Sequence, residues 1–137
     1  MVAYIMERHY RGPVRRKEKR QMVCALRDYN PQVGVPFTLY GGMQGRKRVK
    51  LLDPDPVCTS VLPILMTFDR NHPEIIKYIR VAGDWLDDEE IERFAEKEGF
   101  AVNYPEGTAR WRMGDVWQAK HGFEDFYGLL IEWEPHS

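Results

Sequence analysis

Apolar and polar residues alternate along much of this chain, and the alternation predicts a fold built mainly of β-strands. The longest run, Val57–Phe68, is rich in Val, Ile and Leu. Glu74–Val81 alternates with period two just after it, so we expect the two segments to pair as a hairpin. Further strands are predicted at Val2–Met6, Met22–Leu26, Phe37–Tyr40, Arg46–Leu52 and Phe126–Trp133. We expect Gly41 and Gly42 to interrupt the third of these.

Helices are predicted in the second half of the chain. Asp87 is a suitable N-cap for an acidic helix that Gly99 would end, and we expect that helix to present a solvated face. Thr108 is suited to cap a second helix that runs to about Lys120 and stops at Gly122. The charged stretch 10–19 predicts a loop or a short exposed helix. The sum is an α+β fold: a small, mostly antiparallel β-barrel with two to three helices.

Length and composition agree with a single domain over residues 1–137. The chain is 43% hydrophobic and contains four Trp, seven Tyr and six Phe, which is enough to build one core. No apolar run approaches the roughly 18–20 residues that cross a bilayer, and no leader peptide is expected. These observations predict a cytoplasmic protein without a membrane partner, and they leave its oligomeric state open.

The charge is divided between the two halves of the chain. Residues 1–52 contain twelve Lys or Arg and three acids, a formal charge of +9. Residues 53–137 contain eight bases and eighteen acids, a formal charge of −10. The overall charge of −1 therefore hides a strongly dipolar sequence. A concentrated basic half predicts a polyanion partner, with nucleic acid favoured.

The basic residues concentrate in two clusters, at 15–20 and at 46–50. Clustered Lys and Arg gain affinity for phosphates by releasing counterions. Tyr40 would offer a ring on which a base stacks, unless it belongs to the core. The predicted nucleic-acid contacts are Arg15, Arg16, Lys17, Lys19, Arg20, Gln21, Tyr40, Arg46, Lys47 and Arg48. We expect folding to bring both clusters to one concave wall; a solvated loop and an acidic protein partner remain alternatives.

Other residue types predict no further chemistry. Cys24 and Cys58 lie in β-like segments without a neighbouring base, and we expect two buried free thiols. The four histidines are scattered, so neither a metal site nor a cofactor is predicted. Trp111, Trp117 and Trp133 are expected in the core, because their spacing fits a helix and a strand that pack together.

Several short motifs follow one another in a characteristic order. They are Lys19-Arg20-Gln21-Met22-Val23-Cys24, Leu39-Tyr40-Gly41-Gly42-Met43, Cys58 leading to Pro63-Ile64, Phe94-Ala95 before Gly99-Phe100, Trp117 before His121, and the final Gly128-Leu129-Leu130-Ile131-Glu132-Trp133. This order resembles that of the ASCH domain family, part of the PUA-like β-barrel superfamily, which includes many small phage and bacterial proteins. The resemblance covers nearly the whole chain.

The resemblance implies a PUA-like barrel with a cleft, and a role with RNA or a nucleoside. Some members of the family are amidohydrolases acting on acetylated cytidine, and others are described as ribonucleases. In these, a lysine, a threonine three residues later and a glutamate from a later strand do the work. The lysine corresponds to Lys19, the threonine position is Met22, and the family arginine is Cys24. The predicted strand Val57–Phe68 contains no glutamate. The fold and cleft carry over, whereas the chemistry does not.

Three functions follow from these observations. The first is a non-catalytic, PUA-like module of phage or prophage origin that binds nucleic acid, with RNA favoured. The second is an amidohydrolase or ribonuclease of the ASCH type, with Lys19 as base or nucleophile. The third is a phage structural or host-inhibiting scaffold that binds a protein. An open pocket with Lys19 at its base and a carboxylate in reach would favour the second function. A pocket filled by Met22 and aromatic rings would not.

Overall fold

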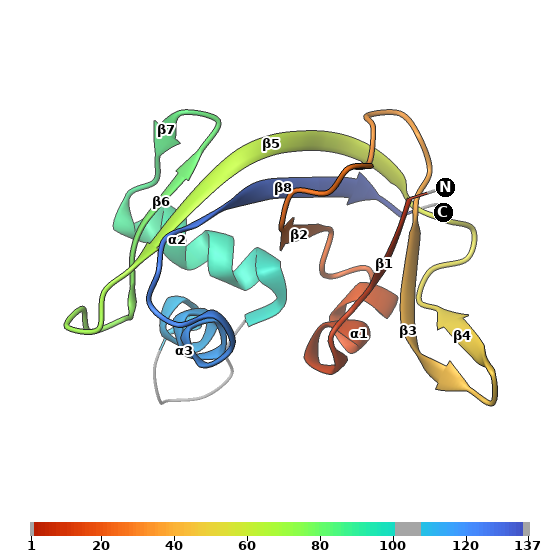
Figure 1. The fold of residues 1–137 in the computed structure, drawn as a ribbon, viewed down its shortest axis with the longest axis horizontal. Coiled ribbons are helices and arrows are strands. Elements are labelled where there is room, and N and C mark those ends of the chain that lie inside the picture. The colour runs from red at the N-terminus through yellow and green to blue at the C-terminus, as the bar shows by residue number, and fades with distance from the viewer. Residues whose placement is uncertain (1, 101–107, 136–137) are drawn as a thin grey trace.

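The computed structural model describes residues 2–100 and 108–135 and has an α+β fold (Figure 1). In chain order the elements are β1 (Ala3–Ile5), α1 (Arg8–Arg15), β2 (Gln21–Cys24), β3 (Thr38–Gln44), β4 (Lys47–Lys50), β5 (Val57–Phe68), β6 (Ile76–Val81), β7 (Asp84–Trp85), α2 (Asp88–Ala95), the π-helical segment η1 (Glu96–Phe100), α3 (Ala109–His121) and β8 (Phe126–Glu134). None of the helices in these described ranges combines the length and apolarity that crossing a membrane requires.

The strands form two sheets. The larger has the antiparallel order β2-β8-β5-β6-β7, and the smaller has the order β1-β3-β4, in which β1 and β3 are parallel. The predicted hairpin of β5 with β6 is confirmed. The predicted closed barrel is wrong, because closure requires the edge strands to pair. In the described residues β2 and β7 remain edges of one sheet, and β1 and β4 remain edges of the other. An isolated bridge pairs Pro36, just before β3, with Val57 at the start of β5.

Each face of the larger sheet builds a separate core. Alternate residues of β5, such as Ile64 and Met66, pack with Ile91 and Phe94 of α2 and with α3 in the first core. The opposite face contributes Ile131 and other β8 residues to a second core with α1 and the smaller sheet. Figure 1 shows the two cores at different ends of the sheet: the long strands arch over α2 and α3 at one end and over α1 at the other. Strand alternation places each set of side chains on its own face.

Local capping signals are confirmed. The Asp87 carboxylate accepts from the Glu90 amide (2.8 Å), and the Glu90 carboxylate accepts from the Asp87 amide (3.0 Å), which is a capping box. Thr108 Oγ1 accepts from the Trp111 amide (3.1 Å), and Gly122 caps the other end of α3 with φ 75°. The α-helical part of the acidic segment is shorter than predicted: α2 ends at Ala95, and the next residues form the π-helical η1.

Of two other local predictions, one is confirmed and one is wrong. The charged stretch 10–19 lies largely in α1, a short helix as one of the two predicted alternatives, with Val14 fully buried. The glycine pair does not interrupt its strand, because β3 continues to Gln44 with an irregularity between Tyr40 and Met43. Gly41 instead allows close packing: a Cβ there would lie 2.7 Å from Cδ2 of Leu51.

Candidate functional site

Lys19 lies inside the molecule, between α1 and β2. The backbone leaves α1 through a tight turn in which the Pro13 carbonyl accepts from the amides of Glu18 (3.0 Å) and Lys19 (3.1 Å). Lys17 takes the left-handed conformation there, with φ 63°. This turn directs the Lys19 side chain inward, where it is 1% exposed. A lysine buried to that extent requires a partner for its charge.

Glu98 is that partner. The Lys19 ammonium donates to the Glu98 backbone carbonyl (2.6 Å) and to Oε2 of its carboxylate (3.1 Å). Gln21 Nε2 donates to the other carboxylate oxygen, Oε1, at 3.1 Å. Glu98 is itself 1% exposed. The three side chains therefore form a buried network that joins the basic first half of the chain to the acidic second half.

The surroundings of the network are shaped by Tyr10 and Gly99. The Lys19 ammonium lies 4.3 Å from the centroid of the Tyr10 ring, a cation–π contact. Gly99 has φ 110°, and the position of an added Cβ there would be 3.6 Å from both Lys19 Cδ and a Tyr10 ring atom. Gly99 thus supports the left-handed backbone that presents Glu98 to Lys19. Gly99 was predicted only to end the helix; in the structure it also packs against Lys19 and Tyr10.

Burial dominates the electrostatics of this network. Burial lowers the pKa of the Lys19 ammonium, and the Glu98 carboxylate opposes that change. Burial also raises the pKa of the Tyr10 phenol, and the Glu98 charge adds to the rise. A lysine with a lowered pKa is suited to act as a base or nucleophile. Its side chain, however, is 0% exposed, so a substrate does not reach it in this conformation.

Of the two features that would favour an enzyme, the structure has one. A carboxylate lies within reach of Lys19, but Lys19 does not lie at the base of an open pocket. Met22, at the family's threonine position, points into the second core and is 5% exposed. It brings no hydroxyl to the network. In this conformation the network holds the two halves of the chain together.

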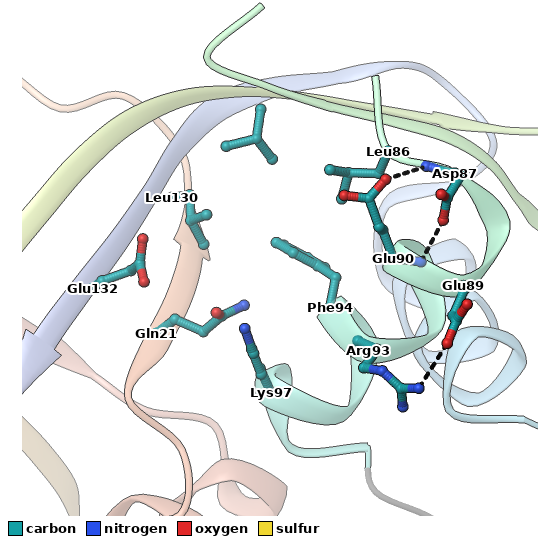
Figure 2. A pocket seen from close by; sticks show the side chains of 11 residues that line it. Gln21, Leu86, Asp87, Glu89, Glu90, Arg93, Phe94, Lys97, Leu130 and Glu132 are labelled. Atoms are coloured by element: carbon teal, nitrogen blue, oxygen red, sulfur yellow. Dashed lines mark hydrogen bonds and ion pairs between the residues drawn. The ribbon is translucent and has the colours of Figure 1, made fainter. Parts of the chain in front are cut away.

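Gln21 connects the buried network to a pocket of about 390 Å³. Figure 2 shows Gln21, Leu130 and Glu132 on one side of it and the start of α2 on the other, with Phe94 between them. A second pocket of about 250 Å³ shares Gln21, Lys97 and Glu132 with the first. Both pockets meet where β2 pairs with β8, since Gln21 is the register partner of Glu132. The pockets combine an apolar wall with both signs of charge.

The first predicted basic cluster divides between surface and interior. Arg15, Arg16, Lys17 and Arg20 are exposed, whereas Lys19 and Gln21 are buried. Lys19 and Gln21, predicted as nucleic-acid contacts, therefore lie inside the protein, where both contact Glu98. Arg16 pairs with Glu18 (3.0 Å) and Arg20 with Glu134 (3.5 Å), both at the surface. Exposed pairs of this kind are weak and are readily exchanged for another anion.

The second basic cluster lies at the turn between β3 and β4. Arg46, Lys47 and Arg48 are all exposed. Tyr40 is half-buried in the central strand of the smaller sheet, opposite Ile5 on β1 and Lys50 on β4. Lys50 pairs with Asp55 (3.4 Å).

α1 packs against the strand that leads into this turn. Arg11 Nε donates to the Met6 carbonyl (3.1 Å), and the position of an added Cβ at Gly42 would be 3.1 Å from Arg11 Nη1. The structure therefore brings α1 and the β3–β4 hairpin into contact.

The remaining predicted residues have mixed outcomes. Cys24 and Cys58 are both free, with Cys58 buried and Cys24 half-buried. Trp117 and Trp133 belong to the cores, but Trp111 does not: it is 40% exposed on α3. Within residues 2–100 and 108–135, no three His, Cys, Asp or Glu side chains gather as a metal site would require.

Glu98 is the residue of this site that sequence reasoning missed. It fell within the acidic helix that was predicted to present a solvated face. Its neighbours Glu96 and Lys97 are exposed as that prediction implies, whereas Glu98 is buried. Its separation from Lys19 is 79 residues, and it lies on η1 rather than on the long strand in which a glutamate was sought. The adjacent Gly99 was the available signal, since a glycine that ends a helix takes a left-handed conformation and changes the direction of the backbone. No family model, curated protein or solved structure matches this chain, so the ASCH resemblance stays a prediction.

Proposed function

We propose that this protein is a non-catalytic, PUA-like module of phage or prophage origin that binds nucleic acid, with RNA favoured, in the cytoplasm of the host cell. The proposal rests on the placement of charge rather than on a pocket. Nucleic-acid affinity arises mainly from cations that replace the counterions of phosphates, and such cations must be exposed and available.

The observation that carries the proposal is a set of exposed cations without acidic partners. Arg15 at the end of α1 and Arg46, Lys47 and Arg48 on the hairpin are exposed, and none of the four forms an ion pair with any residue in the described ranges. α1 and the strand leading to the hairpin are in contact through Arg11. These cations are therefore available to phosphates without first breaking an internal pair.

Tyr40 supports the same proposal. It shares a lateral row of the smaller sheet with Ile5, which is 54% exposed, and with Lys50. Lys50 pairs with Asp55, but a half-buried ring on a sheet that also carries Lys47 and Arg48, unpaired within the described ranges, offers a base a stacking surface near phosphate contacts. Tyr40 would then hold a base while Lys47 and Arg48, on the neighbouring strand, hold the backbone.

Binding of a labelled single-stranded RNA, measured by fluorescence anisotropy over a series of salt concentrations, tests the proposal. We expect the affinity of the wild type to fall steeply with salt. Removal of three phosphate contacts in R46Q/K47Q/R48Q should weaken binding and reduce the slope of log K against log salt by about 2, at about 0.7 per contact. The triple variant R70Q/R93Q/K97Q, which removes the same charge from the other half of the chain, is the matched control and should retain the wild-type slope.

Two results would overturn the RNA-binding proposal. One is an affinity that does not change with salt, and the other is the absence of binding at low salt. Equal losses in the hairpin variant and in the control variant would show that net charge, and not this surface, attracts the RNA.

A second candidate is hydrolysis of an amide or phosphodiester bond by Lys19, and it is favoured by one observation. Glu98 supplies the carboxylate that the resemblance requires and that the predicted strand lacks. Access to Lys19 would require η1 to move away from it. Incubation with acetylated cytidine and, separately, with RNA tests this candidate by product release in the wild type, in Lys19→Ala and in E98Q, each checked for folding by circular dichroism. Equal product in all three proteins would dismiss it.

A further inference from the structure

One face of the larger sheet is covered at one end and open at the other. Near the smaller sheet, the row Met22–Ile131–Val61 crosses three strands and packs into the second core, where Ile131 is fully buried. Strand alternation keeps the side chains of Leu65 and Tyr127 on that same face. There the covering elements have ended, and Tyr127 is 68% exposed.

The open end carries aromatic side chains in register. Leu65 is the partner of Tyr127 on β8 and of Arg80 on β6, and Arg80 is the partner of Trp85 on β7. Laterally paired residues share a face, so these four form one row across four strands. Tyr78, two residues before Arg80, lies beside the row, and its ring meets that of Trp85 at 5.8 Å. We name Tyr78, Arg80, Trp85 and Tyr127 the aromatic platform.

Exposure of these rings requires an explanation. Trp85 is 55% exposed and Tyr78 is 50% exposed, although each would contribute to stability if buried. The row from Tyr127 to Trp85 spans three strand separations, about 14 Å, which is wider than one base. Large rings spread along an open sheet face, with cations between them, form a surface on which successive bases of a single strand stack.

The positive charge of Arg80 in the platform also favours a single-stranded nucleic acid. Arg80 lies in the middle of the row, with its guanidinium carbon 5.3 Å from the Trp85 ring centroid, and it forms no ion pair with any residue that the structure describes. Lys77 lies 5.5 Å from the Tyr78 ring but pairs with Asp69 (4.0 Å), so Arg80 is the cation on which the platform depends. Asp84 alternates with Trp85 and so points to the opposite face. The acidic helix α2 also packs on that opposite face, through Ile91 and Phe94.

We propose that the aromatic platform is a second contact for single-stranded RNA, in which Trp85 and Tyr127 stack on bases and Arg80 binds the intervening phosphate. This inference rests on the proposed function, and it adds a site far from the basic hairpin. In Figure 1, β6 and β7 lie at the opposite end of the long sheet from β3 and β4. The hairpin contributes mainly phosphate contacts and the platform mainly base contacts, so one strand that reaches both is held at two points.

The experiment compares a labelled single-stranded oligouridylate with an abasic oligomer of the same length. The W85S/Y127S variant should bind the oligouridylate at least about fivefold more weakly than the wild type, with an unchanged salt slope because no phosphate contact is lost. The abasic oligomer should bind both proteins equally. The W85F/Y127F variant retains the rings and should retain the wild-type affinity, and unfolding in urea confirms that each variant is folded.

The outcomes separate this inference from the proposed function. If R46Q/K47Q/R48Q loses affinity while W85S/Y127S binds as the wild type does, the platform is refuted and the proposed function stands. If the wild type binds no RNA at low salt, both are refuted. If sedimentation velocity shows a wild-type dimer that W85S/Y127S dissociates, the occupant of the platform is a second copy of the chain, which refutes its role in RNA binding.

Discussion

Two buried cations, Arg110 and Lys19, have their charge balanced by different kinds of partner. Arg110 on α3 is 2% exposed, and its guanidinium donates twice to the Ile76 carbonyl (3.0 and 2.8 Å) and once to the Lys77 carbonyl (3.0 Å). Its carboxylate partner, Asp88 at 2.8 Å, lies in solvent. Lys19 instead meets a carboxylate, Glu98, that is as buried as itself.

The difference indicates what each cation contributes. Arg110 mainly supplies hydrogen bonds to the backbone at the start of β6, inside the acidic half of the chain. Lys19 balances an opposite charge that would otherwise be isolated, and it does so between the basic and the acidic halves. Removal of one partner of a buried ion pair costs much more than removal of an exposed partner. The predictions below test this contrast, in order of decreasing effect.

Replacement of Lys19 by methionine should have the largest effect. K19M leaves the Glu98 carboxylate buried with only Gln21 as a side-chain donor, and we expect the free energy of unfolding to fall by about 3–5 kcal/mol, measured with urea. The double variant K19M/E98L, which removes both charges, should recover most of this loss. A K19M protein as stable as the wild type would contradict the burial of Glu98.

Replacement of Arg110 by lysine should have an intermediate effect. R110K keeps the positive charge but loses the planar group that reaches the carbonyls of Ile76 and Lys77 together. An unmatched buried carbonyl costs about 1–3 kcal/mol, and we expect a loss in that range by urea unfolding. A loss equal to that of K19M would mean that charge, and not hydrogen-bond geometry, is the main contribution of Arg110.

The pH dependence of stability should distinguish Lys19 by its sign. Burial lowers the pKa of Lys19, so between that value and the unfolded value of about 10.4 the unfolded chain binds more protons. Stability from this group therefore rises with pH in that window. Tyr4, Tyr10 and Cys24, whose pKa values burial raises, act in the opposite direction. Their contributions cancel in the difference in stability between wild type and K19M, which should increase as pH rises toward the unfolded pKa of lysine, about 10.4. A difference that decreases with pH would show that folding raises the pKa of Lys19 instead of lowering it.

Replacement of Asp88 by asparagine should have the smallest effect. The hydrogen bond from Arg110 lowers the pKa of the Asp88 carboxyl, so the stability from this pair is present above the unfolded pKa and is lost as pH falls through the folded one. Asp88 lies in solvent, which screens the pair. We expect D88N to unfold at the same urea concentration as the wild type at neutral pH. A marked shift would make Asp88 a partner comparable to Glu98.

Much of the secondary structure was predictable because its signals are local. Val57–Phe68 was identified with the bounds that the structure has, and Asp87, Thr108 and Gly122 occupy the cap positions assigned to them. Such signals depend on neighbours within one strand or one helical turn. Lys19 was also identified as a central residue, but as one that faces a ligand. Trp111 was misplaced because its helix periodicity does not indicate which face a neighbour covers.

The sequence by itself determined the strands, the caps and the division of charge, since each depends on composition or on residues close along the chain. The tertiary structure alone decided that the larger sheet stays open, that Glu98 turns inward to meet a lysine 79 residues away, and that Tyr78, Trp85 and Tyr127 share one uncovered face. These features depend on contacts between distant segments. Such contacts form only where the packing of the whole domain offsets the entropy of bringing those segments together and the cost of burying charge.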